Sequence, residues 1–446
     1  MAYVPNTDKD KKEMLSVIGV DDIEKLLKDI PQEIRLKKGL NLPYPLSEIE
    51  LKKKMLSLSE KNADLLHYTS FLGAGAYDHY IPSVVEHLIS RSEFYTAYTP
   101  YQAEASQGML QSIYEFQSMI CELTGMDVAN ASMYDGASST AEAAMMALRI
   151  TKRKEVIVSS ALHPNYRTVL KTYLQGIGIT IKEIPFKDGI TDVNALSISD
   201  NTAAVIIQQP NFLGCIEELS AINAITKKFG ALFIVSVDPI SMGILKSPGE
   251  LGADIVVGEG QSLGNSLSFG GPYLGFFAAR KEYVRQMPGR LVGATVDAQG
   301  KKGYCLTLQA REQHIKRERA TSNICTNQAL CALSATVYLS VIGKEGLRKV
   351  AELCLQKTHY AQREITKIEG FSSPFPAPFL KEFVIKMPVS AEKVLKGLLA
   401  EKIIGGLKLE NYYPELKDHL LICVTEKRTR AEIERLAELL QRYPFP

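Results

Sequence analysis

The segment ALFIVSVD, residues 231–238, is an apolar run that ends in a carboxylate. Seven consecutive residues without a charge are typical of a strand that is buried on both faces. Similar short apolar runs occur on both sides of it, with helical periodicity between most of them. The alternation predicts an α/β fold, in which helices cover both faces of a mostly parallel sheet. The expected strands are 155–159, 203–208, 231–237, 254–257 and 273–278.

The chain of 446 residues is longer than one hydrophobic core usually supports, so more than one domain is expected. The first sixty residues are polar and interrupted by prolines, which predicts a helical arm. In this arm Ser47 is the expected N-cap of a helix, with Glu50 as its capping-box partner. The predicted organisation is an N-terminal arm at 1–60, a large α/β domain at 61–310, and a linking helix (roughly residues 327–341) with a smaller α/β domain at 311–446.

The composition argues against several classes of function. Lysine and arginine total 52 against 50 acidic residues, so there is no strong basic field for nucleic acid or an anionic membrane. No stretch is expected to span a bilayer, and the charged N-terminal residues do not resemble a signal peptide. The seven cysteines are scattered without a CxxC pair, which predicts neither a metal site nor a disulfide framework. A cytoplasmic protein is therefore expected.

Four short features are candidates for chemistry, and each also has a purely structural explanation. Tyr134 is followed by DGASST and then a helix, whose first N–H groups can bind phosphate or simply be capped. His163 follows a strand end, where open α/β sheets gather ligands, although a lone histidine is more often structural. Asp238 closes a buried strand and needs a partner, either a charged group or a backbone N–H. The fourth feature is a glycine-rich loop after residue 257, which contains Gln261.

In this order the four features resemble the large domain of fold-type-I pyridoxal-phosphate (PLP) enzymes. Those enzymes bind the phosphate at a helix start, stack a residue on the ring, pair an aspartate with the ring nitrogen and form a Schiff base with a lysine. Alignment on GGP at 270–272 places Gln261 at the position of that lysine, and Lys246 and Lys281 lie on the wrong sides. The resemblance implies a degenerate pocket without a covalent anchor, formed by Gly136, Ala137, Ser138, Ser139, His163, Asp238 and Gln261.

Longer motifs give a more specific resemblance. The segment YTAYTPYQAEASQGMLQSIYEFQSMICELTGMDVANASMYDGASSTAEAA, residues 95–144, closely resembles the P-protein of the glycine cleavage system. RATSNICT at 319–326 and VPNTD at 4–8 resemble the same family, and the resemblance covers essentially the whole chain. In that family the enzyme is either one chain with two related halves or an assembly of two subunit types, and the lysine belongs to the second. Gln261 and the chain length imply the first, lysine-less subunit.

The resemblance also implies an activity. The family decarboxylates PLP-bound glycine and transfers the remaining aminomethyl group to the lipoyl arm of the H-protein, in an α2β2 assembly. This chain is then expected to be inactive alone, to leave PLP to the partner subunit, and to complete the partner's active site. The candidate contributors lie in or beside a tyrosine-rich loop at residues 95–104 and in the 319–326 segment. They are Tyr95, Tyr98, Tyr101, Gln102, Glu104, Gln107, Thr321, Ser322 and Asn323.

Two other functions stay open at this level. The chain could be an independent PLP enzyme, such as an aminotransferase or a desulfurase that uses another lysine, and Gln261 is the feature against this. It could also be a non-enzymatic subunit that only stabilises its partner, in which case the tyrosines pack a plain subunit contact. The many hydrogen-bonding groups of the tyrosine-rich loop argue against mere packing.

Overall fold

The computed structural model describes residues 5–36 and 38–443. They belong to two compact units, Met1–Ala63 and Asp64–Pro446. Val4, the first residue of the VPNTD motif, lies outside the described residues.

The first unit is an arm with little internal packing. Its helices are α1 (Asp8–Ile18), the 3-10 helix η1 (Ile23–Leu27) and α2 (Glu48–Ser59). The predicted capping box is confirmed, because the Ser47 hydroxyl accepts from the backbone N–H of Glu50 and the Glu50 carboxylate accepts from that of Ser47. None of the side chains described in this unit is buried.

A seven-stranded sheet forms the centre of the second unit, in the order β2-β10-β9-β8-β7-β3-β4. The strands from β9 to β4 run parallel to one another, whereas β10 is antiparallel to both of its neighbours. This confirms the predicted α/β class, and the five apolar runs of the sequence correspond to β3, β7, β8, β9 and β10. The strands are β2 (Val128–Ala129), β3 (Glu155–Ser159), β4 (Thr180–Ile184), β7 (Thr202–Gln209), β8 (Leu232–Val237), β9 (Ile255–Glu259) and β10 (Gly275–Ala279).

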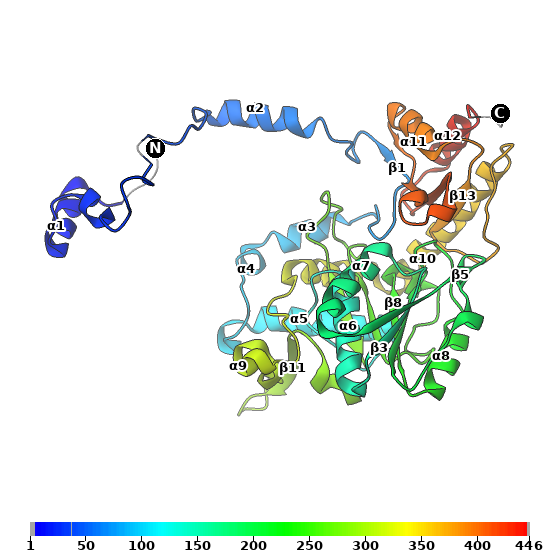
Figure 1. Ribbon diagram of the computed structural model, residues 1–446, viewed down its shortest axis with the longest axis horizontal. Helices are drawn as coiled ribbons and strands as arrows, with labels where there is room; N and C mark the ends of the chain where they lie inside the picture. Colours follow the sequence, from blue (N-terminus) through cyan, green and yellow to red (C-terminus); the bar gives the residue numbers. More distant parts are fainter. Residues whose placement is uncertain (1–4, 37, 444–446) are drawn as a thin grey trace. The chain divides into compact units, whose positions relative to one another are not determined.

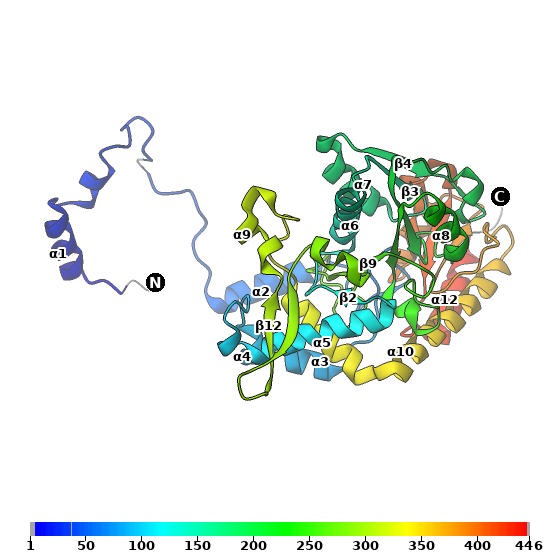
Figure 2. The same ribbon diagram turned by 90° about the horizontal axis from the view of Figure 1, so that it is seen from below.

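Helices cover both faces of this sheet because its strands are apolar on both sides (Figures 1 and 2). On one face Val205 of β7 packs in a cluster with residues of α5, α8 and α10, and on the other Ile206 packs with residues of α6 and α7. The covering helices are α3 (Ser83–Ile89), α5 (Gln107–Thr124), α6 (Gly136–Thr151), α7 (Pro164–Leu174), α8 (Leu219–Lys228) and α10 (Ala329–Thr366).

A second, smaller sheet lies at the C-terminal end of the chain. It has the order β13-β16-β15 and is antiparallel, and its core includes residues of α11, α12 and the end of α10. These elements, orange to red in Figure 1, gather at one end of the unit. The predicted boundary at residue 310 stays a prediction. The elements are β13 (Glu382–Lys386), α11 (Ala391–Ala400), β15 (Leu407–Lys408), β16 (His419–Cys423) and α12 (Arg430–Leu440).

Short pairs of strands complete the unit. β1 (Thr69–Ser70) pairs in parallel with β14 (Ile403–Ile404), which fixes the start of the unit to its C-terminal elements. β5 (Phe186–Lys187) and β6 (Ile190–Thr191) form a small hairpin.

A longer hairpin, β11 (Leu291–Val296) and β12 (Lys302–Thr307), was not predicted from the sequence. Only its base is buried, where Val292 and Leu306 pack on α5. The hairpin lies near the short helices α4 (Ser92–Tyr95) and α9 (Gln313–Lys316), at the opposite end of the unit from the C-terminal elements (Figures 1 and 2).

Helix α10 corrects two expectations. The sequence predicts an end near residue 341, whereas the helix continues to Thr366 across a break at Gly343. By length and composition it is also apolar enough to cross a membrane, contrary to the expectation that no stretch is. Its apolar residues serve the core instead, where Leu333 and Tyr338 are buried. The break has φ 58° and ψ −174°, a conformation open essentially only to glycine.

We expect Gly343→Ala to reduce the free energy of unfolding by about 1–3 kcal/mol, because alanine is strained at this break. Urea unfolding followed by circular dichroism measures the change. Gly176→Ala is the control, since that glycine has no positive φ and open space around it, and a change below about 1 kcal/mol is expected there. Equal effects of the two substitutions would contradict the argument.

Candidate functional site

The residues predicted to form a degenerate pocket do meet at one edge of the large sheet. His163 follows β3, Asp238 follows β8 and Gln261 follows β9, and the carboxyl ends of parallel strands share an edge. Gly136 begins α6, and its N–H donates to Glu259, two residues before Gln261. The structure therefore brings the four sequence features together.

A segment of the same chain fills this pocket. We call residues 73–79, which follow β1, the plug. Gln261, at the position of the missing lysine, holds the plug by its backbone. Its Oε1 accepts from the N–H of Tyr77 at 2.8 Å, and its Nε2 donates to the carbonyls of Tyr77 at 3.2 Å and Asn265 at 2.7 Å. The whole amide of this buried side chain is thus used in structural hydrogen bonds.

The plug requires glycine at its closest approach to the sheet edge. Gly75 has φ +104°, and a Cβ on it would lie 2.9 Å from Nε2 of His163. The neighbouring carbonyl of Ala74 accepts a hydrogen bond from that same nitrogen at 2.9 Å. The glycine-rich character of this loop therefore reflects its insertion into the pocket.

Lys381 supplies the positive charge that Asp238 needs. Its Nζ lies 2.8 Å from Oδ2 of Asp238 and 3.4 Å from the centre of the Tyr77 ring, and the lysine is only 3% exposed. The other carboxylate oxygen accepts from the backbone N–H of Ile240 at 3.3 Å. Asp238 thus has both of the partners considered from the sequence. In the PLP scheme this aspartate faces a protonated ring nitrogen, and here an ammonium beside an aromatic ring takes that place.

Glu382 closes the pocket from the C-terminal sheet. Its carboxylate accepts from the Tyr77 hydroxyl at 2.8 Å and from the Ala74 N–H at 2.6 Å. Burial raises the pKa of Glu382 to about 7. The cavity between Tyr77, Asp238, Lys381 and Glu382 has a volume of only about 10 Å³, which is the space of a single water molecule.

The start of α6 is capped by carboxylates of the protein itself. The N–H of Gly136 donates to Glu259 at 3.0 Å, and that of Ser138 donates to Asp135 at 2.7 Å. Ser139 donates its hydroxyl back to the carbonyl of Asp135, and Ala137 is buried. Burial raises the pKa of Glu259 to about 7. The N–H groups of Gly136 and Ser138, which a phosphate would use at this helix start, are therefore satisfied internally.

His163 stacks on an aromatic ring of the protein. Its ring centre lies 4.8 Å from that of Tyr166, with the planes at 21°, and 4.7 Å from that of Phe212. Its Nδ1 accepts from the N–H of Asn165 at 3.1 Å, so the proton is on Nε2, which donates to Ala74. Burial lowers the pKa of His163 to about 4, and the imidazole is neutral at physiological pH.

The residues of this pocket do not fit PLP. Among the described residues no lysine is placed to bind it, since Gln261 anchors the plug and Lys381 pairs with Asp238. The space for a ring is filled by Tyr77, and the helix start has its own carboxylates. Lys381 was not predicted from the sequence, because a lysine at the start of an apolar strand gives no sign that it points to the edge of the large sheet.

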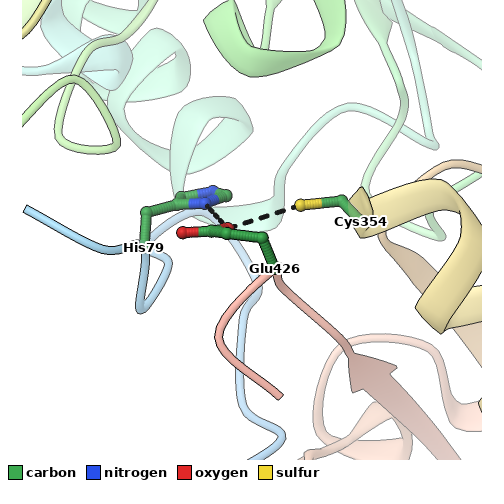
Figure 3. Close-up of side chains that lie close together, drawn as sticks. All are labelled: His79, Cys354 and Glu426. Carbon is green, nitrogen blue, oxygen red and sulfur yellow. Dashed lines mark hydrogen bonds and ion pairs between the residues drawn. The ribbon is translucent and has the colours of Figure 1, made fainter. Parts of the chain in front are cut away.

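Among the described residues, one cluster of potential metal ligands includes His79 of the plug (Figure 3). Nδ1 of His79 lies 2.6 Å from Oε2 of Glu426, and the Cys354 sulfur lies 3.6 Å from the same oxygen. Nε2 of His79 lies 3.3 Å from the Lys381 ammonium. Burial raises the pKa of the Cys354 thiol, which keeps it protonated. The cluster is thus linked through Lys381 to Asp238. A dication bound in the cluster would be repelled by the Lys381 ammonium.

The tyrosine-rich loop lies elsewhere, near α4 and the β11–β12 hairpin (Figures 1 and 2). Tyr95, Tyr98 and Tyr101 are 66%, 86% and 51% exposed. Tyr98, Tyr101 and Gln102 line an open cleft of about 770 Å³. A cleft with phenols, amides and hydroxyls suits a polar ligand or partner.

Helix α5 connects this loop to the hairpin. The amide of Gln107 donates to the carbonyls of Ala103 and Tyr304, and accepts from the N–H of Tyr304 at 2.8 Å. In the same way Gln117 brackets Val292 of β11. Gln107 is therefore occupied in joining loop and hairpin, whereas the exposed side chains of Gln102 and Glu104 make no hydrogen bond within residues 5–36 and 38–443.

The second predicted segment reaches the base of the same hairpin. The N–H of Thr321 donates to the carbonyl of Arg311 at 3.2 Å, and the Ser322 hydroxyl accepts from the N–H of Ile324 at 3.1 Å, while Asn323 is exposed. Arg311 follows β12, and Arg290, which precedes β11, donates to the Tyr101 hydroxyl at 3.0 Å. These two buried arginines were not predicted from the sequence, because their neighbours in sequence do not differ from those of surface arginines.

Comparisons with known proteins agree on one family. The family model of the glycine cleavage system P-protein matches residues 1–440. A probable glycine dehydrogenase (decarboxylating) subunit 1 from Desulforamulus reducens is 58% identical over 442 residues, which cover 99% of each chain.

Solved structures extend this similarity to the fold. A crystal structure of the glycine decarboxylase (P-protein) of the glycine cleavage system, in inhibitor-bound form, superposes with a TM-score of 0.91 at 42% identity, over 99% of this chain and all of that one. A C-DES mutant with glycine covalently linked to its PLP cofactor has a TM-score of 0.60 at 16% identity, over 81% and 94% of the two chains. This second similarity concerns the fold alone.

We expect Lys381→Met to destabilise the protein by about 3–5 kcal/mol, because it leaves the Asp238 carboxylate buried without a counter-charge. Urea unfolding measures this loss, and adding Asp238→Asn should recover part of it. Lys367→Met is the matched control, since Lys367 pairs with Glu364 at the surface and should cost at most about 1 kcal/mol. Similar losses for the two lysines would refute the role of the buried ion pair.

The stability that Glu382 contributes should depend on pH. Its folded pKa of about 7 lies above the ordinary value of 4.5, so this contribution is fully present below 4.5 and is lost as the pH rises through 7. The free energy of unfolding of the wild type, relative to Glu382→Gln, should therefore fall by about 2–3 kcal/mol between about pH 5 and 8. The exposed Glu369→Gln should give a curve parallel to the wild type, and a parallel curve for Glu382→Gln would contradict the assignment.

Proposed function

This chain belongs to the glycine cleavage system P-protein family, and from that premise we propose that it is the lysine-less subunit of a two-subunit glycine decarboxylase. It works with a second subunit, which carries the PLP-binding lysine. Together they decarboxylate glycine and transfer the aminomethyl group to the lipoyl arm of the H-protein. The expected assembly is an α2β2 heterotetramer, and the chain alone is inactive.

The observation that carries this proposal is the plug in the chain's own pocket. Gln261 holds the backbone of Tyr77, and the Lys381 ammonium faces Asp238, so the groups that bind PLP in related folds bind the protein itself. A subunit of a PLP-dependent family with such a pocket needs its cofactor on another chain. PLP is therefore assigned to the partner subunit.

The contribution of this chain to the reaction is assigned to the hairpin end of the second unit. There the tyrosine-rich loop and the 321–323 segment meet at the base of one hairpin, beside a cleft of about 770 Å³. Loops held by a rigid scaffold are where binding residues concentrate. We assign this end to the contact with the partner's active site, where glycine is bound.

The arm supports an obligate assembly. Its described side chains include many large apolar ones, and the packing of the arm itself buries none of them. Leu36, Leu40, Leu42 and Ile49 are each about 70% exposed, which is costly in water unless another surface covers them. The partner subunit is the surface that we assign to this role. A cytoplasmic location stays a prediction from the composition.

Of the alternatives, the independent PLP enzyme has the closed pocket against it. A purely stabilising subunit has in its favour that Gln107 is used structurally. The tyrosine-rich loop argues against that role. Some of its exposed polar side chains make no hydrogen bond with residues 5–36 and 38–443 of this chain.

We expect the isolated chain to show no absorption band of covalently bound PLP, and the reconstituted pair to show a band that responds to glycine. Gln261→Lys should still trap no PLP with borohydride on the isolated chain, because Tyr77, Lys381 and Glu259 occupy the places of ring, ring nitrogen and phosphate. The partner subunit, tested in the same way, is the positive control for trapping.

Two results would count against the proposal. Covalent PLP on the isolated wild-type chain would identify an independent enzyme. A correctly assembled pair without any glycine-dependent reaction would remove the assigned activity.

Full activity of the pair after separate substitution of Tyr95, Tyr98 and Glu104 would favour the stabilising subunit.

A further inference from the structure

Among the three exposed tyrosines of the loop, Tyr101 alone has a polar contact through its side chain within the described part of the chain. Nη2 of Arg290 donates to its hydroxyl at 3.0 Å, and the guanidinium carbon lies 5.5 Å from the ring centre. Arg290 is only 6% exposed, and the His314 and Tyr101 rings lie edge to face, with their planes at 68° and ring centres 5.9 Å apart. Tyr101 is therefore fixed in place.

The hydrogen bond from Arg290 determines what the Tyr101 hydroxyl offers. A phenol can accept and donate, and the acceptor role is taken by the guanidinium. Its own O–H finds no acceptor among the side chains and backbone groups of residues 5–36 and 38–443. Tyr101 is one of the residues that line the 770 Å³ cleft, and its unpaired O–H is a hydrogen-bond donor that is polarised by a cation.

The charges beneath Tyr101 favour an anion in the cleft. Arg290 and Arg311 are both more than nine-tenths buried, and the Glu312 carboxylate, whose oxygen lies 3.9 Å from Nε of Arg290, is the acid beside them. Nε and Nη1 of Arg290 and Nε and Nη2 of Arg311 have no hydrogen-bond partner in the part of the chain that the structure describes. Burial accordingly lowers the pKa of Arg311 and raises that of Glu312. Arg290, Arg311 and Glu312 together therefore carry a net positive charge.

We propose that Tyr101 binds an oxyanion, a carboxylate or a phosphate monoester, in the shared site by donating its hydroxyl proton, and that Arg290 is the residue that positions and polarises this hydroxyl. The inference rests on the proposed function, because the ligand enters where the two subunits meet. Two sources have this chemistry, the carboxylate of the substrate glycine and the phosphate of a cofactor held by the partner. Arg311 adds positive charge behind Arg290 without touching the ligand.

The other two tyrosines lack these properties. Tyr95 and Tyr98 are more exposed than Tyr101, and their side chains make no hydrogen bond with any described residue. Ordering such a side chain on binding costs conformational entropy, whereas Tyr101 is already ordered by Arg290 and His314. A donor held in advance at the right position binds an anion more tightly.

The test uses Tyr101→Phe in the reconstituted two-subunit enzyme, since this substitution removes one oxygen from a half-exposed side chain. Two quantities are measured, the KM for glycine at saturating PLP, and the dissociation constant of PLP by equilibrium dialysis without glycine. Loss of a hydrogen bond to a charged group should raise one of them by about 10- to 100-fold. A rise in KM alone identifies the substrate carboxylate, and weaker PLP binding identifies the cofactor phosphate.

Arg290→Lys and Arg290→Gln test the positioning role. Each should produce a smaller change in the same quantity as Tyr101→Phe, and neither should add to the effect once Tyr101 is phenylalanine. A merely structural arginine would weaken both quantities equally, whether residue 101 is tyrosine or phenylalanine. Tyr173→Phe on α7 and the exposed Arg285→Gln, five residues before Arg290, are matched controls that should change neither quantity.

A change below twofold in both quantities for Tyr101→Phe, with an assembled and active wild type, would overturn the inference and leave the proposed function intact. Absence of glycine-dependent activity in the wild-type pair would instead refute the proposed function itself. Gel filtration of each variant pair separates a loss of assembly from a loss of binding.

Discussion

The buried ion pair between Lys381 and Asp238 is the interaction on which the rest of the molecule depends. It joins the end of β8 in the large sheet to the start of β13 in the small one, and the Tyr77 ring lies against its ammonium. A buried charge without a counter-charge costs several kcal/mol, so the plug, the C-terminal sheet and the edge of the large sheet must stay together. This series of side-chain interactions continues on one side through His79 to Glu426 and on the other through Tyr77 to Glu382.

In this arrangement the protein's own side chains satisfy the groups that bind the cofactor in related folds. The large sheet leaves a polar edge at the carboxyl ends of its strands, with N–H donors at the start of α6 and a carboxylate at Asp238. Those groups must be satisfied by something. Here Glu259 caps the helix, Lys381 neutralises the aspartate and Gln261 binds the plug. The pocket is therefore a buried polar network, which holds the two sheets in one geometry.

Because this pocket is filled, we propose the hairpin end of the unit as the place where this subunit takes part in chemistry. Helix α5 sets its geometry, because Gln107 and Gln117 on one helix bracket both strands of the hairpin. The base of the hairpin in turn carries Arg290, which orders one tyrosine of the loop. Structure at this end is thus determined by side-chain amides and buried guanidinium groups, and the loop itself stays open to a partner.

The sequence by itself determined the α/β class, the five apolar strands, the capping box of α2 and the P-protein family, since apolar periodicity and long motifs are local properties of the chain. It also identified Gln261 as a residue unable to bind PLP covalently. The domain limits and the roles of the candidate residues stay predictions. Only the tertiary structure decided that the chain closes its own pocket, because Tyr77, Gln261 and Lys381 are some 120 to 300 residues apart and nothing local marks their contact. The hairpin, the break at Gly343 and the buried Arg290 depended on packing in the same way, since a charged residue in sequence looks the same whether water or a folded neighbour surrounds it.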